Sequence, residues 1–170
     1  MPGYRWPYQP YRNGRLAPEV YATPGQPTFF TIRAARDRAP FADSRFADIA
    51  VRYLLEQRRK SSCELAVYCV MHDHIHAVVI PAIEGTSSLT YIDRLKGRCG
   101  RECRLAGWEG ALWQPRSYDH VLRKDEALER VVAYVLQNPV RRGLEASAED
   151  YQWSGMPEAI FGEGIEIGRI

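Results

Sequence analysis

The histidines are the first residues whose types and spacing suggest chemistry. All four of them are candidates: His72, His74, His76 and His120. Residues 74–80 are β-branched and apolar apart from two histidines, and Pro81 follows, which predicts a short buried strand. Residues two apart on a strand share a face, so we expect His74 and His76 side by side and Ile75 on the opposite face. Two imidazoles on a rigid strand would form half of a divalent-metal site. The alternative is two structural histidines that are satisfied by hydrogen bonds.

A tyrosine and an asparagine near the end of the chain could supply the other half. Apolar residues at helical spacing predict a helix there: Leu128, Val131, Val132 and Val135. Tyr134 falls roughly 120° from the centre of this stripe, so packing alone does not explain it. Asn138 is four residues further on and neighbours Tyr134 on one helix face. A tyrosine is a nucleophile only when a metal, a cation or a base offsets its pKa of about 10. Against the histidine strand, this helix would give two imidazoles, an amide and a phenol.

The elements that must position these residues follow from periodicity and from turn residues. They are a strand at 28–33, a helix at 43–60, strands at 64–71 and 74–80, a helix at 88–105, an interrupted strand at 111–122, and a helix from 125–126 to 138–139. The second and third strands should pair antiparallel across the short link at 72–73. The order β-α-β-β-α-β-α predicts an α+β fold, an antiparallel sheet with helices on one face, as in ferredoxin-like sandwiches.

Length and composition indicate one globular domain. The 170 residues divide into an Arg- and Tyr-rich arm at 1–26, a domain at 27–155 and a tail at 156–170. Hydrophobic residues make up 45% and charged residues 26%, which is ordinary for a soluble protein. No apolar run approaches ~20 residues, and the N-terminus lacks the apolar core of a signal peptide. We therefore expect a cytoplasmic protein without a membrane partner.

The basic residues are nearly all arginines, although the net charge is only +2. Arginine suits bidentate contacts with phosphate and base edges, but a biased genomic composition would also explain its use. The candidate DNA contacts are Arg5, Arg12, Arg94, Arg98, Arg101 and Arg116. The alternatives are an irregular arm that packs over the domain, and a solvated face on the helix at 88–105.

Taken in order, these segments resemble a known enzyme family. His74-Ile75-His76, followed by Tyr134-x-x-x-Asn138-Pro139, resembles the HUH single-strand endonucleases of the single-tyrosine transposase type. The chain is most similar to the REP-associated tyrosine transposases and their insertion-sequence relatives. The supporting segments are 68–80, 112–115, 118–123 and 134–144, and the resemblance spans 28–154. Relatives usually carry proline where this chain has His72, which leaves open whether His72 also reaches the metal.

The resemblance implies a fold, a metal and a reaction. The fold is the HUH endonuclease sandwich. His74, His76 and Asn138 would hold one Mg²⁺ or Mn²⁺. Tyr134 would attack a phosphate of a single-stranded DNA hairpin, giving a 5′-phosphotyrosyl DNA and a free 3′-hydroxyl. The protein would act as a monomer or a homodimer. His72, Tyr118 and His120 are accessory candidates, and Tyr118 is also the rival nucleophile.

Two other functions stay open at this point. One is a domesticated protein that binds structured DNA, with the site intact but cleavage unused. The other is a nucleotide hydrolase of the histidine-triad type, which His72-x-His74-x-His76 superficially resembles. In that class the intervening positions should be apolar, and Asp73 is not.

Overall fold

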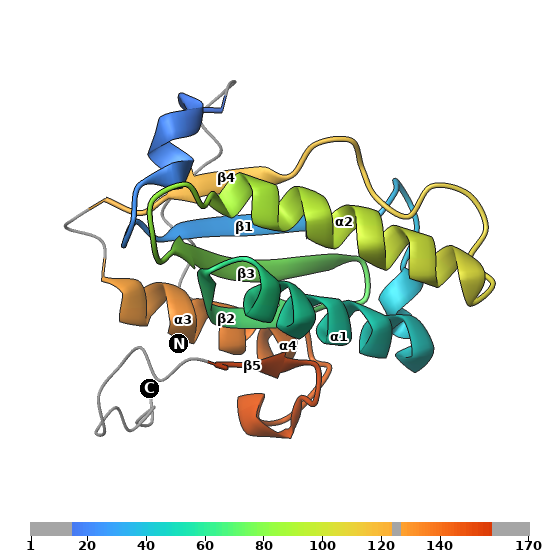
Figure 1. The fold of residues 1–170 in the computed structure, drawn as a ribbon. Coiled ribbons are helices and arrows are strands. Elements are labelled where there is room, and N and C mark those ends of the chain that lie inside the picture. Colours follow the sequence, from blue (N-terminus) through green and yellow to red (C-terminus); the bar gives the residue numbers. More distant parts are fainter. Residues whose placement is uncertain (1–14, 124–126, 158–170) are drawn as a thin grey trace.

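The structure is a computed structural model that describes residues 15–123 and 127–157. Five antiparallel strands form one sheet, and they are β1 (Thr28–Arg33), β2 (Cys63–Val70), β3 (His74–Pro81), β4 (Tyr118–Val121) and β5 (Ser154–Gly155). The helices are α1 (Ser44–Lys60), α2 (Ser88–Leu105), α3 (Leu128–Leu136) and the short α4 (Asn138–Arg141). Short 3-10 turns lie at Pro18–Ala22, Pro40–Ala42 and Ala148–Asp150. The strand order is β4-β1-β3-β2-β5, which confirms the predicted α+β fold with an antiparallel sheet (Figure 1).

The histidine strand β3 is the central strand of this sheet. It pairs with β2 across the link at 72–73, as predicted, and with β1 on its other side. Thr31 of β1 lies opposite His76 and also opposite Tyr118 of β4. Directly opposed residues in antiparallel strands project from the same face. Tyr118, Thr31 and His76 therefore form one row across three strands.

Helices cover both faces of the sheet. Helices α1 and α2 pack on one face, over a core that includes Phe30, Ile32, Leu54, Ile75 and Leu95. Helix α3 packs on the other face, over a core that includes Phe29, Val67, Val78, Val132 and Val135. The prediction that all helices lie on one face is therefore wrong. The apolar stripe of α3 needs a partner surface, and the first face is already covered by the two long helices.

Several element boundaries differ from the sequence-based expectation. The third helix ends at Leu136, and Pro139 lies in the first turn of α4 instead of ending the helix. Proline is accepted there because the first turn of a helix has no intrahelical partner for its backbone nitrogen. The predicted start at 125–126 lies outside the described residues. The interrupted strand at 111–122 contributes only β4 and an isolated bridge from Trp113 to Ala34.

Part of the predicted N-terminal arm packs on the domain. Tyr21 is buried, and its hydroxyl donates a hydrogen bond to the carboxylate of Asp119 on β4. The Ser88 hydroxyl at the start of α2 donates to the Tyr21 carbonyl at 3.3 Å. These contacts attach Pro18–Ala22 to both β4 and α2, whereas Arg5 and Arg12 lie outside the described residues. Within the described ranges, no helix is long and apolar enough to cross a membrane.

Candidate active site

His74 and His76 lie side by side on the α3 face of the sheet, as their spacing predicts. Each is only 6% exposed, and Ile75 between them packs in the opposite core. The two Nε2 atoms face each other at 3.1 Å. Because β3 is paired on both sides, the backbone that carries the two imidazoles is held rigidly.

The second nitrogen of each imidazole has its own partner. Asp73 Oδ1 lies 2.6 Å from His74 Nδ1, and Thr31 Oγ1 lies 3.0 Å from His76 Nδ1. An ionised carboxylate only accepts hydrogen bonds, so His74 carries its proton on Nδ1 and keeps a lone pair on Nε2. A hydroxyl both donates and accepts, so Thr31 is compatible with either neutral tautomer of His76.

Two arrangements of the pair follow from these partners. In one, His76 Nε2–H donates to His74 Nε2 while the Thr31 hydroxyl donates to His76 Nδ1. In the other, His76 carries its proton on Nδ1, and both Nε2 lone pairs point at the same place. A cation shared by the two Nε2 atoms would stabilise this second arrangement. A hydrogen-bond partner on the remote nitrogen, such as Asp73 for His74 and Thr31 for His76, is typical of metal-binding histidines.

Electrostatics keep both imidazoles neutral. Burial lowers the pKa of His76 well below its usual value, and the neighbouring His74 and Arg33 lower it further. Burial also lowers the pKa of His74, although the hydrogen bond to Asp73 acts in the opposite direction. Burial is the largest single influence on Asp73 and raises its pKa, but the hydrogen bond with His74 and the nearby charges of His74 and Arg142 together outweigh it, so the pKa of Asp73 is lowered. Neutral imidazole is the form that ligates metal.

The spacing of the pair fits one divalent ion. Two nitrogens that are each about 2.1 Å from an ion, at an angle of about 90–109°, lie about 3.0–3.4 Å apart, and the observed 3.1 Å falls in this range. Within residues 15–123 and 127–157, no third His, Cys, Asp or Glu completes a metal-binding group with them. His72, which precedes β3, forms no such group with the pair in this structure, and its part in metal binding stays a prediction. Among the described residues, a further ligand would therefore be of another type.

Asn138 is the predicted ligand of another type, and its amide orientation is defined. Its side chain is buried, and Nδ2 lies 2.7 Å from the backbone carbonyl of Tyr134. A carbonyl only accepts, so the atom that faces it is the amide nitrogen and Oδ1 points elsewhere. Among the described residues, no hydrogen bond joins Asn138 to either histidine. Oδ1 is the amide atom that a divalent ion would bind, and it is not engaged by the carbonyl groups at the end of α3.

Tyr134 lies beside the histidine pair. Its ring centroid is 5.9 Å from that of His76 and 6.3 Å from that of Phe29, which itself stacks on His76 at 5.3 Å. The guanidinium carbon of Arg141, on α4, lies 5.1 Å from the Tyr134 ring centroid. The apolar stripe of α3 therefore presents this phenol to the histidines, as the helical spacing predicts.

The other accessory candidates lie on the same face but further away. Tyr118 is two strands from His76, with β1 between them, and its ring meets the edge of Phe29 at 6.4 Å. His120 is opposite Phe29 and so also faces the α3 side. Tyr134 is thus in ring contact with His76, whereas strand β1 lies between Tyr118 and His76 in the sheet.

Two arginines that the sequence did not single out approach the pair. Arg33 is directly opposite His74 in the β1–β3 register, and its side chain is exposed. Arg142 follows α4, and its positive charge lowers the pKa of Asp73 and of both histidines. We call Arg33, Arg141 and Arg142 the basic rim. Only the strand register reveals Arg33, since 41 residues separate it from His74 in the chain.

The arginines predicted to contact DNA lie elsewhere. Arg94, Arg98 and Arg101 are on α2, across the sheet from the histidines, so the structure does not bring them to the site. Arg116 is exposed between β4 and Pro115, whose carbonyl accepts a hydrogen bond from Lys96 at 3.2 Å. Their role in binding DNA stays a prediction.

Comparison with known proteins finds two similar proteins that are both named REP-associated tyrosine transposases. No model of a protein family matches the chain. The chain is 26% identical over 110 residues to a Haemophilus influenzae protein named as a REP-associated tyrosine transposase, covering 59% of this chain and 62% of that one. It is 22% identical over 135 residues to the REP-associated tyrosine transposase of Escherichia coli, covering 79% and 78%. The match thus spans less than two thirds of the Haemophilus protein.

A solved structure shares the fold. It is a REP-associated tyrosine transposase bound to a REP hairpin, and it matches with a TM-score of 0.67 at 21% identity. The match covers 86% of this chain and 82% of the solved chain. The sheet with helices on both faces is therefore the architecture of that protein as well.

Proposed function

Because the chain belongs to the REP-associated tyrosine transposase family, we propose that it is a DNA transposase that cuts and rejoins single strands at the site of His74, His76 and Tyr134. The observation that carries this proposal is the position of the phenol. Its ring lies 5.9 Å from the imidazole of His76, whose Nε2 converges with that of His74. A nucleophile beside a metal-binding pair is the arrangement that phosphoryl transfer to a side chain requires.

The residues fit a divalent ion. His74 and His76 would bind Mg²⁺ or Mn²⁺ through Nε2, and Asn138 would bind it through Oδ1. Two imidazoles favour Mn²⁺, because Mg²⁺ prefers oxygen ligands. Bound there, the ion would polarise a non-bridging oxygen of the scissile phosphate. Asp73 and Thr31 would hold the protons on the two Nδ1 atoms, which keeps both Nε2 lone pairs available.

Tyr134 is the proposed nucleophile. Its hydroxyl loses a proton as the bond from Oη to phosphorus forms, and the bond from phosphorus to the 3′ oxygen breaks. The 3′ oxygen takes up a proton, which leaves a 5′-phosphotyrosyl DNA and a free 3′-hydroxyl. Attack by a 3′-hydroxyl on the phosphotyrosine reverses the step, so strands are joined without ATP. The exposed guanidinium groups of Arg33 and Arg142 would bind phosphate oxygens beside the ion.

The proposed substrate is single-stranded DNA folded into a hairpin. The solved protein with the same fold is bound to a REP hairpin, which supports this choice. The proposal applies to the described domain, because the chain matches only part of the Haemophilus relative.

Covalent capture tests the proposal. The protein is incubated with end-labelled hairpin oligonucleotides drawn from the repeats flanking its gene, with Mn²⁺ or with EDTA, and the products are separated on denaturing gels. We expect a metal-dependent protein–DNA adduct that is lost in Tyr134→Phe and kept in Tyr118→Phe. An adduct that survives Tyr134→Phe would overturn the assignment of the nucleophile. Hairpin binding without an adduct in any metal would instead favour a binding protein that does not cleave.

A further inference from the structure

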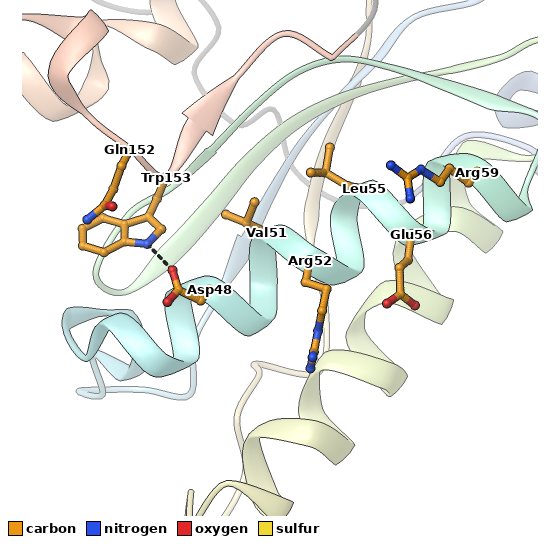
Figure 2. Close-up of a pocket in the computed structure, with 8 residues that line it drawn as sticks. All are labelled: Asp48, Val51, Arg52, Leu55, Glu56, Arg59, Gln152 and Trp153. Carbon is orange, nitrogen blue, oxygen red and sulfur yellow. Dashed lines mark hydrogen bonds between the residues drawn. The ribbon is translucent and has the colours of Figure 1, made fainter.

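A groove lies between α1 and α2, across the sheet from the histidines. Its volume is about 520 Å³, and its lining residues are Gln57, Lys60, Arg94, Gly97, Arg98 and Arg101. Four of these six residues are cations, and none is an acid. A second hollow, of about 410 Å³, lies on α1 next to Trp153 and is different in character (Figure 2). There Asp48 and Glu56 balance Arg52 and Arg59, and Asp48 accepts a hydrogen bond from Trp153 Nε1 at 2.9 Å.

The cations of the α1–α2 groove are only weakly neutralised by their neighbours. Glu56 Oε2 lies 3.6 Å from Lys60 Nζ and 3.9 Å from Arg98 Nη1. Glu102 Oε1 lies 3.3 Å from Arg101 Nη1. Two carboxylates thus offset half of four positive charges, through exposed pairs that water and salt screen. Arg94 forms no ion pair with another described residue. These side chains can turn toward an anion at little cost.

A buried donor without an acceptor also lines the groove. Gln57 is 2% exposed, and its Nε2 has no hydrogen-bond partner among the described residues. A buried polar group without a partner is uncommon, because it has lost its hydrogen bonds to water. Because Nε2 itself is shielded from solvent, a ligand oxygen in the groove would supply the missing acceptor only if the Gln57 side chain turned outward. Gly97 keeps the α2 wall open, since a Cβ built there would meet nothing within 4 Å.

The cations are arranged in a line. Arg94, Arg98 and Arg101 recur at i, i+4 and i+7 on α2, so they follow one helix face over about 10 Å. A row of guanidinium groups matches a row of phosphates better than it matches one small anion, and arginine suits phosphate in particular. We propose that the α1–α2 groove binds successive phosphates of a nucleic-acid backbone, at a site separate from the cleavage site on the other face of the sheet. The choice of nucleic acid as the polyanion rests on the proposed function.

The salt dependence of DNA binding tests this proposal. Binding of the full chain to a fluorescein-labelled DNA hairpin is measured by anisotropy between about 50 and 200 mM salt. Each phosphate contact that is removed lowers the slope of log K against log salt by about one. We expect Arg94→Gln/Arg101→Gln to lower the slope by about two. The matched control Arg36→Gln/Arg59→Gln removes the same charge from exposed positions outside the groove, and its slope should stay close to wild type. Equal slopes for the two double variants would overturn the proposal.

A second pair of variants tests the groove itself. Gly97→Glu places a carboxylate in open space and should weaken binding at every salt concentration, whereas Gly97→Gln, of similar size and neutral, should weaken it much less. Equal loss in both would indicate a steric effect and would contradict phosphate binding. Vesicles containing phosphatidylserine serve as another probe. If they require Arg94 and Arg101 while the DNA does not, the groove binds lipid and the proposal is wrong.

The test of the groove can be distinguished from the test of the cleavage reaction. Tyr134→Phe should abolish the covalent adduct and leave the salt slope unchanged, because Tyr134 lies on the opposite face of the sheet. If wild-type protein forms no adduct but the slope still depends on Arg94 and Arg101, the groove stands and the cleavage proposal fails. If the adduct forms and the slope is unchanged by substitution of Arg94 and Arg101, the cleavage proposal stands and the groove proposal fails.

Discussion

Replacing Thr31 by valine should weaken metal binding at the histidine pair without removing a ligand. Valine keeps the branched shape but loses the hydroxyl that lies 3.0 Å from His76 Nδ1. For Nε2 to bind a metal, Nδ1 must carry the proton and donate it, and His76 is only 6% exposed, so water does not readily replace the lost acceptor. A buried donor left without a partner costs about 1–3 kcal/mol.

That cost falls mainly on the metal-binding tautomer. The loss of a partner behind a ligating histidine typically lowers metal affinity by about 10–100-fold. This range corresponds to about 1.4–2.7 kcal/mol and agrees with the cost of the unpaired donor. We therefore expect Thr31→Val to bind Mn²⁺ about 10–100-fold more weakly than wild type. Thr31→Ser keeps the hydroxyl and should stay within a few-fold of wild type.

Calorimetric titration of the full chain with Mn²⁺ measures this change. Urea denaturation without added metal shows whether each variant is still folded. The ¹⁵N spectrum of the imidazoles gives a second readout, since Mg²⁺ should move the proton of His76 from Nε2 to Nδ1 in wild type. The reasoning would be refuted if Thr31→Val bound Mn²⁺ as tightly as wild type, or if serine were as damaging as valine.

Three further predictions test other parts of the structure. Gly97→Ala should raise the free energy of unfolding by about 0.5–1 kcal/mol in urea denaturation, because alanine favours helix and its Cβ meets no atom; a loss of stability would contradict this. Burial and the hydrogen bond to Asp119 raise the pKa of Tyr21 to about 12, so its contribution to stability is full below about pH 10 and is lost as the pH rises toward 12. Denaturation at stepped pH should therefore show a shallower alkaline decline for Tyr21→Phe than for wild type, and identical declines would refute this. Arg33→Gln should slow adduct formation about tenfold or more, since an ionic phosphate contact is lost, while Mn²⁺ affinity changes only a few-fold. A slower rate that is explained entirely by weaker Mn²⁺ binding would argue against the phosphate contact.

Much of the site follows from local sequence patterns. The period of two on a strand places His74 and His76 on one face, and the period of 3.6 on a helix turns Tyr134 away from the centre of its apolar stripe. Both patterns depend only on neighbouring residues. Asp73 is also local, because it directly precedes the histidine whose Nδ1 it faces.

The remainder depends on which strands pair and in which register. Thr31 reaches His76 only because β1 lies beside β3. A shift of one residue in this pairing would place a neighbour such as Ile32 opposite His76, and Arg33 would no longer be opposite His74. The stripe of α3 predicts a buried helix face but not which face of the sheet it covers. For the same reason the sequence does not show that the sheet separates the arginines of α2 from the two histidines.

The central position of β3 sets how the chain can change over evolution. A single residue inserted or deleted within β3 would reverse the faces of the residues on one side of the change, unless a bulge absorbed it, and would disturb pairing with two neighbouring strands. By contrast, the connection between α2 and β4 contributes only one bridge to the sheet, so length changes there leave the histidines in place. Homologous chains should therefore vary freely in the length of residues 106–117 while their histidine strand keeps its length, so loop variation can alter the surroundings of the site without disturbing its reactive groups.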